Sequence, residues 1–172
     1  MSTHLVIGGA RSGKSRFAQG LAEAHAGEIS LIVTAEILDA EMAERVAIHR
    51  AERPGHWRVT EAPVELPTAI RQQCGQGRLV LVDCLTLWLS NILCTAPDTL
   101  AGRIDELCDA ICDARGELVL VSNEVGWSIV PENKLARLFR DEQGRLNQRV
   151  AALVERVTLV AAGLPLQLKG KP

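Results

Sequence analysis

Short apolar runs alternate along the chain with longer amphipathic segments. The apolar runs are His4–Ile7, Ser30–Thr34, Leu79–Asp83, Leu118–Ser122 and Val157–Ala161. Each is continuous rather than alternating, as in strands that are covered on both faces of a parallel sheet. The amphipathic segments predict helices at Lys14–His25, Asp39–Arg50, Val64–Cys74, Leu85–Leu93, Leu100–Ala114 and Asn133–Glu155. This order predicts a doubly wound α/β fold with a mainly parallel sheet and helices on both faces, and Leu164–Leu168 is a candidate edge strand.

Length and composition further restrict the number of domains and the classes of partner. The chain has 172 residues without a repeat or a linker-like tract, so we expect one domain spanning 1–172. Nineteen basic against twenty-one acidic residues leave a net charge of −2, which argues against nucleic acid as a partner. No signal peptide and no apolar stretch of roughly 20 residues is found, so we expect a cytoplasmic protein without a membrane span.

The five cysteines are odd in number and include no CxxC pair, which excludes a zinc finger and a disulfide framework. We expect buried free thiols in a reducing compartment.

A phosphate-binding loop follows the first predicted strand. The motif GxxxxGK[ST] is matched by Gly8, Gly9, Ala10, Arg11, Ser12, Gly13, Lys14 and Ser15. It lies between a buried strand and a helix, where backbone N–H groups and the helix N-terminus can bind phosphate. In such a loop Lys14 reaches the β- and γ-phosphates of a nucleoside triphosphate and the Ser15 hydroxyl binds Mg²⁺. The alternative is a glycine-rich turn that matches the motif by chance. Its position between a strand and a helix argues against that alternative.

Asp83 ends the run 78–83 with a carboxylate at the carboxyl end of a predicted strand. Ligands of open α/β sheets bind at that edge. Taken alone, such an aspartate is as often a helix N-cap as a metal ligand. The phosphate loop favours the metal role, but the two motifs together indicate no particular reaction.

A second cluster spans the end of the predicted helix 39–50 and the residues that follow it. Within ten residues the chain places His49, His56, Trp57 and three arginines, two of which are Arg50 and Arg53. A histidine that is largely neutral at pH 7 can act as a nucleophile beside phosphate-binding arginines. The alternative is a helix C-terminus whose basic residues complement the helix dipole.

A third cluster, residues 122–133, follows a predicted strand and leads into a helix rich in charge. Its polar residues are expected at the same sheet edge as Asp83. On the helix, Arg137 and Asp141 are i,i+4 partners, whereas Arg145 and Arg149 repel each other unless an anion lies between them. A solvated helix face is the alternative reading of these charges.

Together these clusters resemble the bifunctional adenosylcobinamide kinase/adenosylcobinamide-phosphate guanylyltransferase family of cobalamin biosynthesis. The matching stretches are GGARSGKS (8–15), TAEILDAEMAERVAIHRAERPGHWRVTEAP (34–63), LVLVDCLTLWLSN (79–91) and VLVSNEVGWSIVPENKLARLFRDEQGRLNQRVA (119–151). They cover most of the chain, and the last stretch is more distinctive than the phosphate loop.

The resemblance implies two reactions with ATP or GTP and Mg²⁺. Adenosylcobinamide is phosphorylated, and GMP then passes from GTP through a guanylylated histidine to adenosylcobinamide phosphate. The motif H-[RK]-x-x-R-P places that histidine at His49. By family position, nucleotide contacts come from the phosphate loop and from Val33, Thr34, Ala35, Arg50, Ala51, Glu52, Arg53, Glu61 and Asp83. Whether Glu61 and Asp83 bind metal or nucleotide hydroxyls stays open.

Two other functions stay open as well: a single-activity P-loop kinase without a covalent intermediate, and a non-enzymatic nucleotide sensor. We expect a homo-oligomer, because a cleft large enough for a corrinoid is hard to build within one small domain, and the resemblance suggests a trimer. The docking surface of the corrinoid is not indicated, and Trp57, Trp88 and Trp127 are candidate apolar walls or core residues.

Overall fold

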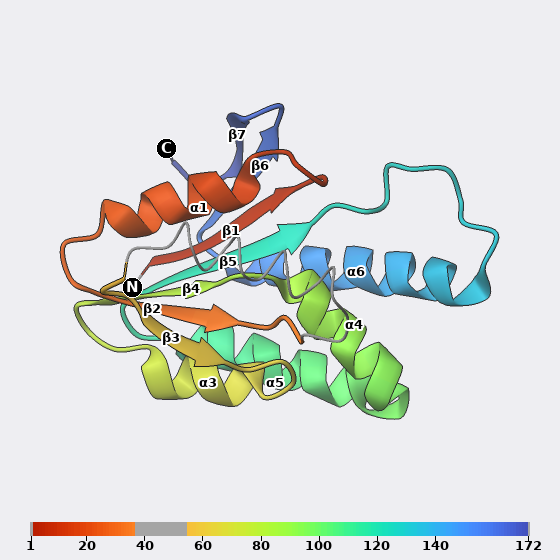
Figure 1. Cartoon of the computed structure of the whole chain (residues 1–172), viewed down its shortest axis with the longest axis horizontal. Coiled ribbons are helices and arrows are strands. Elements are labelled where there is room, and N and C mark those ends of the chain that lie inside the picture. Colours follow the sequence, from red (N-terminus) through yellow and green to blue (C-terminus); the bar gives the residue numbers. More distant parts are fainter. Residues whose placement is uncertain (1, 37–54, 172) are drawn as a thin grey trace.

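The strands form one sheet. The computed structural model describes residues 2–36 and 55–171, and within these the sheet has seven strands in the order β3-β2-β4-β5-β1-β6-β7 (Figure 1). Their bounds are β1 Ser2–Gly8, β2 Glu28–Val33, β3 Arg58–Glu61, β4 Arg78–Val82, β5 Glu117–Asn123, β6 Arg156–Ala161 and β7 Leu164–Lys169. Strands β1 to β6 pair in parallel and β7 pairs antiparallel with β6. The predicted mainly parallel α/β sheet is confirmed.

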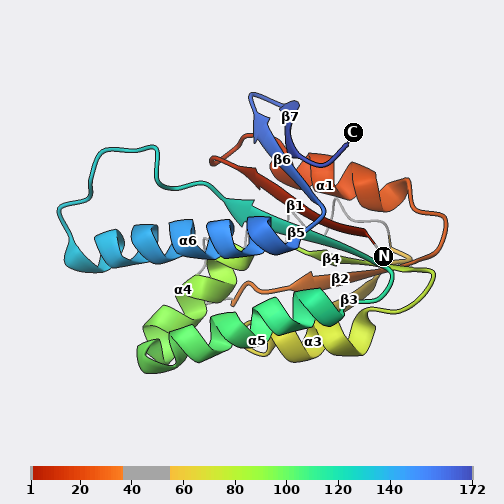
Figure 2. The same ribbon diagram turned by 180° about the vertical axis from the view of Figure 1, so that it is seen from behind.

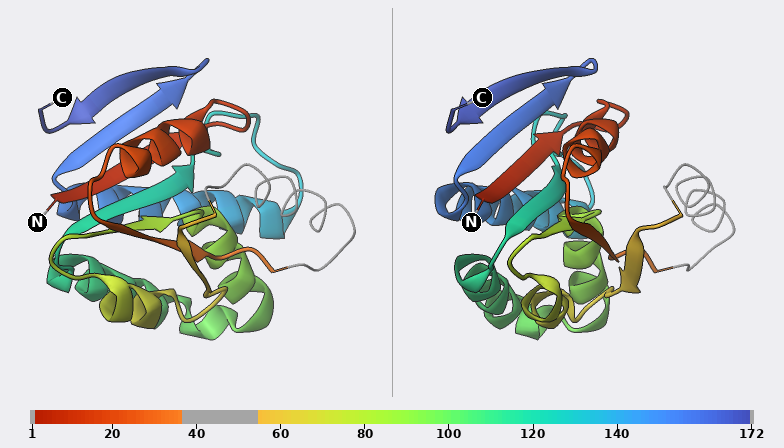
Figure 3. Two further views of the ribbon diagram at one scale, coloured as in Figure 1. Left: turned by 60° about the vertical axis from the view of Figure 1, so that its left-hand side comes forward. Right: turned by 90° about the vertical axis from the view of Figure 1, so that its left-hand side faces the viewer.

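Helices cover both faces of this sheet. They are α1 Lys14–Glu23, α3 Leu66–Gln73, α4 Leu85–Thr95, α5 Leu100–Asp113 and α6 Lys134–Leu153, with a short 3₁₀ turn η1 at Pro97–Thr99. Helix α1 lies on one face, and α3, α4, α5 and α6 lie on the other (Figures 2 and 3). No helix among the described residues is long and apolar enough to span a membrane. The predicted helix 39–50 lies outside the described residues.

The two-sided cover explains the continuous apolar runs. In β4, Val80 and Val82 belong to the core under α3 to α6, whereas Leu79 and Leu81 belong to the core under α1. Successive side chains of a strand point to opposite faces, so a strand buried on both faces needs apolar residues at every position.

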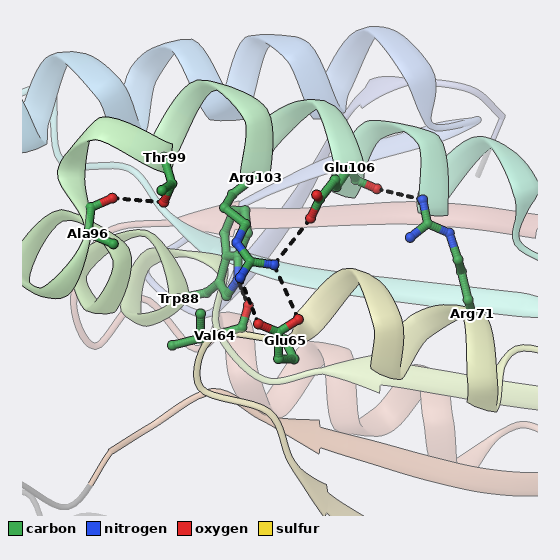
Figure 4. A network of polar contacts seen from close by, with 8 residues as sticks. All are labelled: Val64, Glu65, Arg71, Trp88, Ala96, Thr99, Arg103 and Glu106. Carbon is green, nitrogen blue, oxygen red and sulfur yellow. Dashed lines mark hydrogen bonds and ion pairs between the residues drawn. The ribbon is translucent and has the colours of Figure 1, made fainter.

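Polar contacts join the helices of the larger layer (Figure 4). Arg103 of α5 bonds Glu65, which immediately precedes α3, at 2.7 Å, and also Glu106 on its own helix. Trp88 is fully buried and its indole Nε1 donates to the Val64 carbonyl at 2.8 Å. The buried indole with a satisfied N–H assigns Trp88 to the core, and Trp57 is also buried.

Two expectations need correction. The sequence pattern contained no prediction of β3, because its residues RVTE form an edge strand in which only one position is strongly apolar. The cysteines are all free, as expected, but only Cys108 is buried; Cys94 and Cys112 are exposed. The number and spacing of the cysteines, which suggested buried thiols, carry no information on which face of a helix each one occupies.

Candidate nucleotide site

The phosphate loop connects β1 to α1 and needs glycine at two of its positions. A Cβ on Gly8 would lie 2.5 Å from the Val160 carbonyl oxygen, closer than side-chain carbons approach. Gly13 has φ +92°, a left-handed conformation that glycine adopts without strain, and it immediately precedes α1. The glycine pattern of the motif thus reflects the local backbone geometry as well as the expected close approach of phosphate.

Neighbouring strands hold both halves of this loop. The backbone N–H of Glu124, directly after β5, donates to the Gly8 carbonyl at 3.0 Å. The N–H of Gly163, in the β6–β7 turn, donates to the Ser12 carbonyl at 2.8 Å. The loop is therefore fixed from two sides before any ligand binds.

The cradle contains polar groups that suit a phosphate ligand. The Ser12 hydroxyl oxygen is buried and has no hydrogen-bond partner among the described residues. Lys14 is half-buried, and its Nζ donates to the Gly9 carbonyl at 3.1 Å. Burial lowers the pKa of Lys14 from its ordinary value, and the nearby Asp83 carboxylate acts in the opposite direction. A bound phosphate would restore the favourable environment for the ammonium charge.

Asp83 and Ser15 come together beneath the loop. Both line a small cavity of about 10 Å³, enough for one water-sized group. Asp83 directly follows β4, and its N–H donates to the Ile32 carbonyl at 2.9 Å. Among the described residues, no group of three or more His, Cys, Asp or Glu side chains could hold a metal ion. Hydroxyl and carboxylate oxygens are ligands of the kind that Mg²⁺ accepts, so Ser15 and Asp83 could hold an ion that also receives oxygen ligands from nucleotide phosphates.

The carboxyl ends of β2 and β3 meet beside Asp83. Val33 and Glu61 are register partners in these two parallel strands, so both lie at the same edge of the sheet. The Thr34 hydroxyl donates to the Cys84 carbonyl at 2.6 Å, and Thr34 is fully buried. Its side chain is thus engaged in the fold and holds the end of β2 against the residue that follows Asp83.

Asn91 of α4 is a buried residue that sequence reasoning missed. Its Nδ2 donates to the Thr34 carbonyl at 2.8 Å and to the Pro63 carbonyl at 2.9 Å. These carbonyls belong to the two ends of the connection between β2 and the segment after β3. Asn91 therefore fixes the entry and exit of the stretch that contains the second cluster.

A second buried network fixes the end of β5. Ser122 donates to the Asn147 side-chain oxygen at 2.7 Å, and Gln143 donates to Ser122 at 2.9 Å. Asn147 in turn donates to the Asn123 carbonyl at 3.0 Å, and the Asn123 N–H donates to the Thr86 hydroxyl at 2.8 Å. Gln143 and Asn147 lie at i,i+4 on the apolar face of α6, and this spacing is the signal that could have revealed them.

The charges of α6 differ from their prediction. Asp141 pairs with Arg140 rather than with Arg137. The Arg137 guanidinium donates instead to the carbonyls of Pro131 and Glu132, at 2.9 and 2.6 Å.

Arg145 and Arg149 need no shared anion, because each has its own acidic partner. Arg145 pairs with Glu142 on the same helix, and Arg149 bonds Asp105 of α5 at 2.7 Å. An acidic partner for each arginine thus offsets the repulsion that was expected between Arg145 and Arg149.

Five predicted site residues lie outside the described residues: His49, Arg50, Ala51, Glu52 and Arg53. The structure brings together the remaining ones, from the phosphate loop to Val33, Thr34, Ala35, Glu61 and Asp83, at the carboxyl edge of the parallel strands. Phosphate loops of this kind bind nucleoside triphosphates, so this edge is the candidate nucleotide site.

Comparison with known proteins identifies the family of this site. The family model described as cobinamide kinase / cobinamide phosphate guanyltransferase matches residues 4–168. The chain belongs to the cobinamide kinase / cobinamide phosphate guanyltransferase family. It is 48% identical over 169 residues to the bifunctional adenosylcobalamin biosynthesis protein CobP of Pseudomonas aeruginosa, covering 98% of both chains. It is 40% identical over 179 residues to the bifunctional adenosylcobalamin biosynthesis protein CobU of Salmonella typhimurium, covering 96% of this chain and 98% of the relative.

Solved structures with the same fold are more distant. A type III secretion ATPase, EscN of enteropathogenic Escherichia coli, superimposes with a TM-score of 0.59 at 13% identity, covering 94% of this chain and 43% of that chain. A Pyrococcus horikoshii protein, PH0250, gives 0.57 at 10% identity, covering 99% of this chain and 87% of that chain. These likenesses show that the fold is shared, and no more. Membership of the cobinamide kinase / cobinamide phosphate guanyltransferase family indicates a bifunctional enzyme of adenosylcobalamin biosynthesis.

Proposed function

We propose that the chain 1–172 works as one nucleotide-binding domain with two activities. It phosphorylates adenosylcobinamide with ATP or GTP, and it then transfers GMP from GTP through His49 to adenosylcobinamide phosphate, giving adenosylcobinamide-GDP. The observation that carries the proposal is the preformed phosphate loop, with Lys14, Ser15 and Asp83 gathered at one edge, in a chain of this family.

The kinase step uses the phosphate loop. The aminopropanol hydroxyl of adenosylcobinamide attacks the γ-phosphorus, the β–γ anhydride bond breaks, the hydroxyl proton is released and the nucleoside diphosphate leaves. Lys14 neutralises charge on the β- and γ-phosphates, and the backbone N–H groups of the loop orient them. Mg²⁺ bound through Ser15 and Asp83 would further neutralise the phosphate oxygens.

The guanylyl transfer divides one displacement into two. An imidazole nitrogen of His49 attacks the α-phosphorus of GTP, the α–β anhydride bond breaks and pyrophosphate leaves. A phosphate oxygen of adenosylcobinamide phosphate then attacks the guanylyl phosphorus, and the P–N bond breaks to release the histidine. A neutral imidazole is a competent nucleophile near pH 7, and a P–N bond is labile enough for onward transfer.

Labelling with GTP carrying a radioactive α-phosphate tests the covalent step. We expect acid-labile, base-stable label on the protein, and we expect His49→Ala to abolish it. The matched control is His56→Ala, which removes an exposed histidine seven positions away and should keep the label. Label that persists on the His49→Ala protein would exclude this role, and phosphorylated cobinamide without any label would indicate a single-activity kinase.

The cellular setting and assembly are part of the same proposal. The five unpaired cysteines support a reducing, cytoplasmic compartment. Exposed Leu164, Leu166 and Leu168 on the edge strand β7 support a homo-oligomer, for which the family resemblance suggests a trimer. Light scattering of the purified protein would give the mass, and a monomer at micromolar concentration would contradict this part.

A further inference from the structure

The loop between β5 and α6 carries large apolar side chains that are exposed to solvent. Trp127 is 77% exposed, Ile129 is 92% exposed and Val130 is 60% exposed. The other two tryptophans, Trp57 and Trp88, are buried. Clustered exposed apolar side chains with an aromatic member are typical of a binding surface.

The first turns of α6 extend this apolar region. Leu135 and Leu138 are 56% and 43% exposed. Leu135 also lines a cavity of about 310 Å³ between α4 and α6, together with Leu93 and Phe139. We use the name apolar loop surface for Trp127, Ile129, Val130, Leu135 and Leu138 as a group.

Hydrogen bonds anchor the loop at both ends. At its start, the Glu124 N–H donates to the Gly8 carbonyl at 3.0 Å, so the loop leaves the sheet directly beside the phosphate loop. At its end, Arg137 donates to the Pro131 and Glu132 carbonyls, and the Asn133 side chain caps α6. Between these anchors the loop extends beyond the sheet edge before it returns to α6 (Figure 1).

We propose that the apolar loop surface docks the corrin ring of adenosylcobinamide. The inference rests on the proposed function, because a substrate that receives phosphate at the loop 8–15 must place its bulk beside that loop. A corrin ring is broad, flat and edged with methyl groups and amide-bearing side chains. An exposed indole with neighbouring aliphatic side chains suits such a ring, and the adjoining cavity can take a peripheral substituent.

The leucines of β7 are the competing surface. Leu164 follows Gly163, whose N–H bonds the phosphate loop, so this strand also begins near the site. The three exposed leucines, however, lie on an open sheet edge without an aromatic side chain. An open edge with unpaired backbone groups suits another polypeptide better than a corrin ring.

The test measures KM and kcat for adenosylcobinamide in the kinase reaction with saturating ATP. We expect Trp127→Ala to raise KM about tenfold or more and to change kcat by less than about twofold, because a binding contact is lost while the reacting groups stay in place. Trp127→Phe should recover most of the loss, since it retains an aromatic ring. Equilibrium dialysis of the coloured corrinoid without nucleotide should give a parallel loss of affinity.

Two control variants each replace an exposed leucine that lies outside the apolar loop surface. Leu153→Ser removes an exposed leucine at the opposite end of α6 and should leave KM unchanged. Leu164→Ser tests the competing surface on β7 and should also leave KM unchanged. Labelling of each variant with α-labelled GTP reports an intact nucleotide site and fold.

Several outcomes would overturn the inference. An unchanged KM in a Trp127→Ala protein that still accepts label overturns the docking surface alone. An unchanged KM together with a smaller oligomer by light scattering would assign the surface to a second copy of the chain. A raised KM in Leu164→Ser but not in Trp127→Ala would move the corrin ring to β7. Wild-type protein that does not phosphorylate adenosylcobinamide overturns the proposed function and this inference together.

Discussion

Replacing Asn91 with alanine is expected to destabilise the fold at the edge that carries the nucleotide site. The wild-type carboxamide donates to the Thr34 and Pro63 carbonyls, and Asn91 itself is only 8% exposed. The variant leaves a fully buried and a part-buried carbonyl without this donor. A buried polar group that loses its partner costs about 1–3 kcal/mol, so the two carbonyls together reduce the free energy of unfolding by about 2–6 kcal/mol. For a chain of this size the melting temperature should fall by roughly 4–24 °C.

Urea denaturation followed by circular dichroism measures this change. Asn91→Asp should be at least as destabilising, because a carboxylate accepts rather than donates and its charge would be buried. Gln148→Ala, which removes an exposed amide on α6, is the control and should lie within about 0.5 kcal/mol of wild type. An Asn91→Ala protein as stable as this control would refute the argument that these two bonds hold the edge together.

Three further predictions follow from the geometry. Gly8→Ala should weaken ATP binding at least about tenfold by isothermal titration, because its Cβ meets the Val160 carbonyl at 2.5 Å; wild-type affinity would contradict this. Lys14→Met should abolish detectable triphosphate binding and both activities while leaving the melting temperature within a few degrees, since the Lys14 Nζ donates to the backbone carbonyl of Gly9 in its own loop. Burial lowers the pKa of His4 to about 4 in the folded state, so the unfolded chain binds more protons between pH 6.5 and 4 and stability falls as the pH falls through that range. The loss attributable to His4 is at most about 3 kcal/mol, and His4→Gln should flatten this part of the pH profile of unfolding; an unchanged profile would exclude His4 as its source.

The parts of the fold that local pattern determines could be predicted from the sequence. Buried strands such as β4 are continuous apolar runs because both faces are covered, and the phosphate loop has a fixed spacing because its backbone requires glycine at Gly8 and Gly13. Asp83 was expected at the carboxyl end of its strand and does lie there, paired through its N–H with Ile32. In each case the pattern that reveals the feature lies within a few consecutive residues, even where the contact behind it is distant, as with Val160 at Gly8.

The parts that depend on distant partners could not be predicted. Asn91 joins carbonyls 57 and 28 positions away, and nothing local distinguishes it from a surface asparagine. Arg149 pairs with Asp105 of α5, whereas the i,i+4 rule considers only its own helix. Strand β3 is stabilised by pairing with β2 and has too few apolar residues to be recognised as an edge strand. The role of His49 stays a prediction from family resemblance.

Product analysis tests the central claim most directly. Purified protein is incubated with adenosylcobinamide, GTP and Mg²⁺, and the corrinoid products are separated by chromatography and identified by mass spectrometry. One protein that performs both steps yields adenosylcobinamide-GDP, with adenosylcobinamide phosphate as an intermediate that accumulates and then declines. A reaction that stops at adenosylcobinamide phosphate would contradict the guanylyl transfer, and an unchanged corrinoid would contradict the account as a whole.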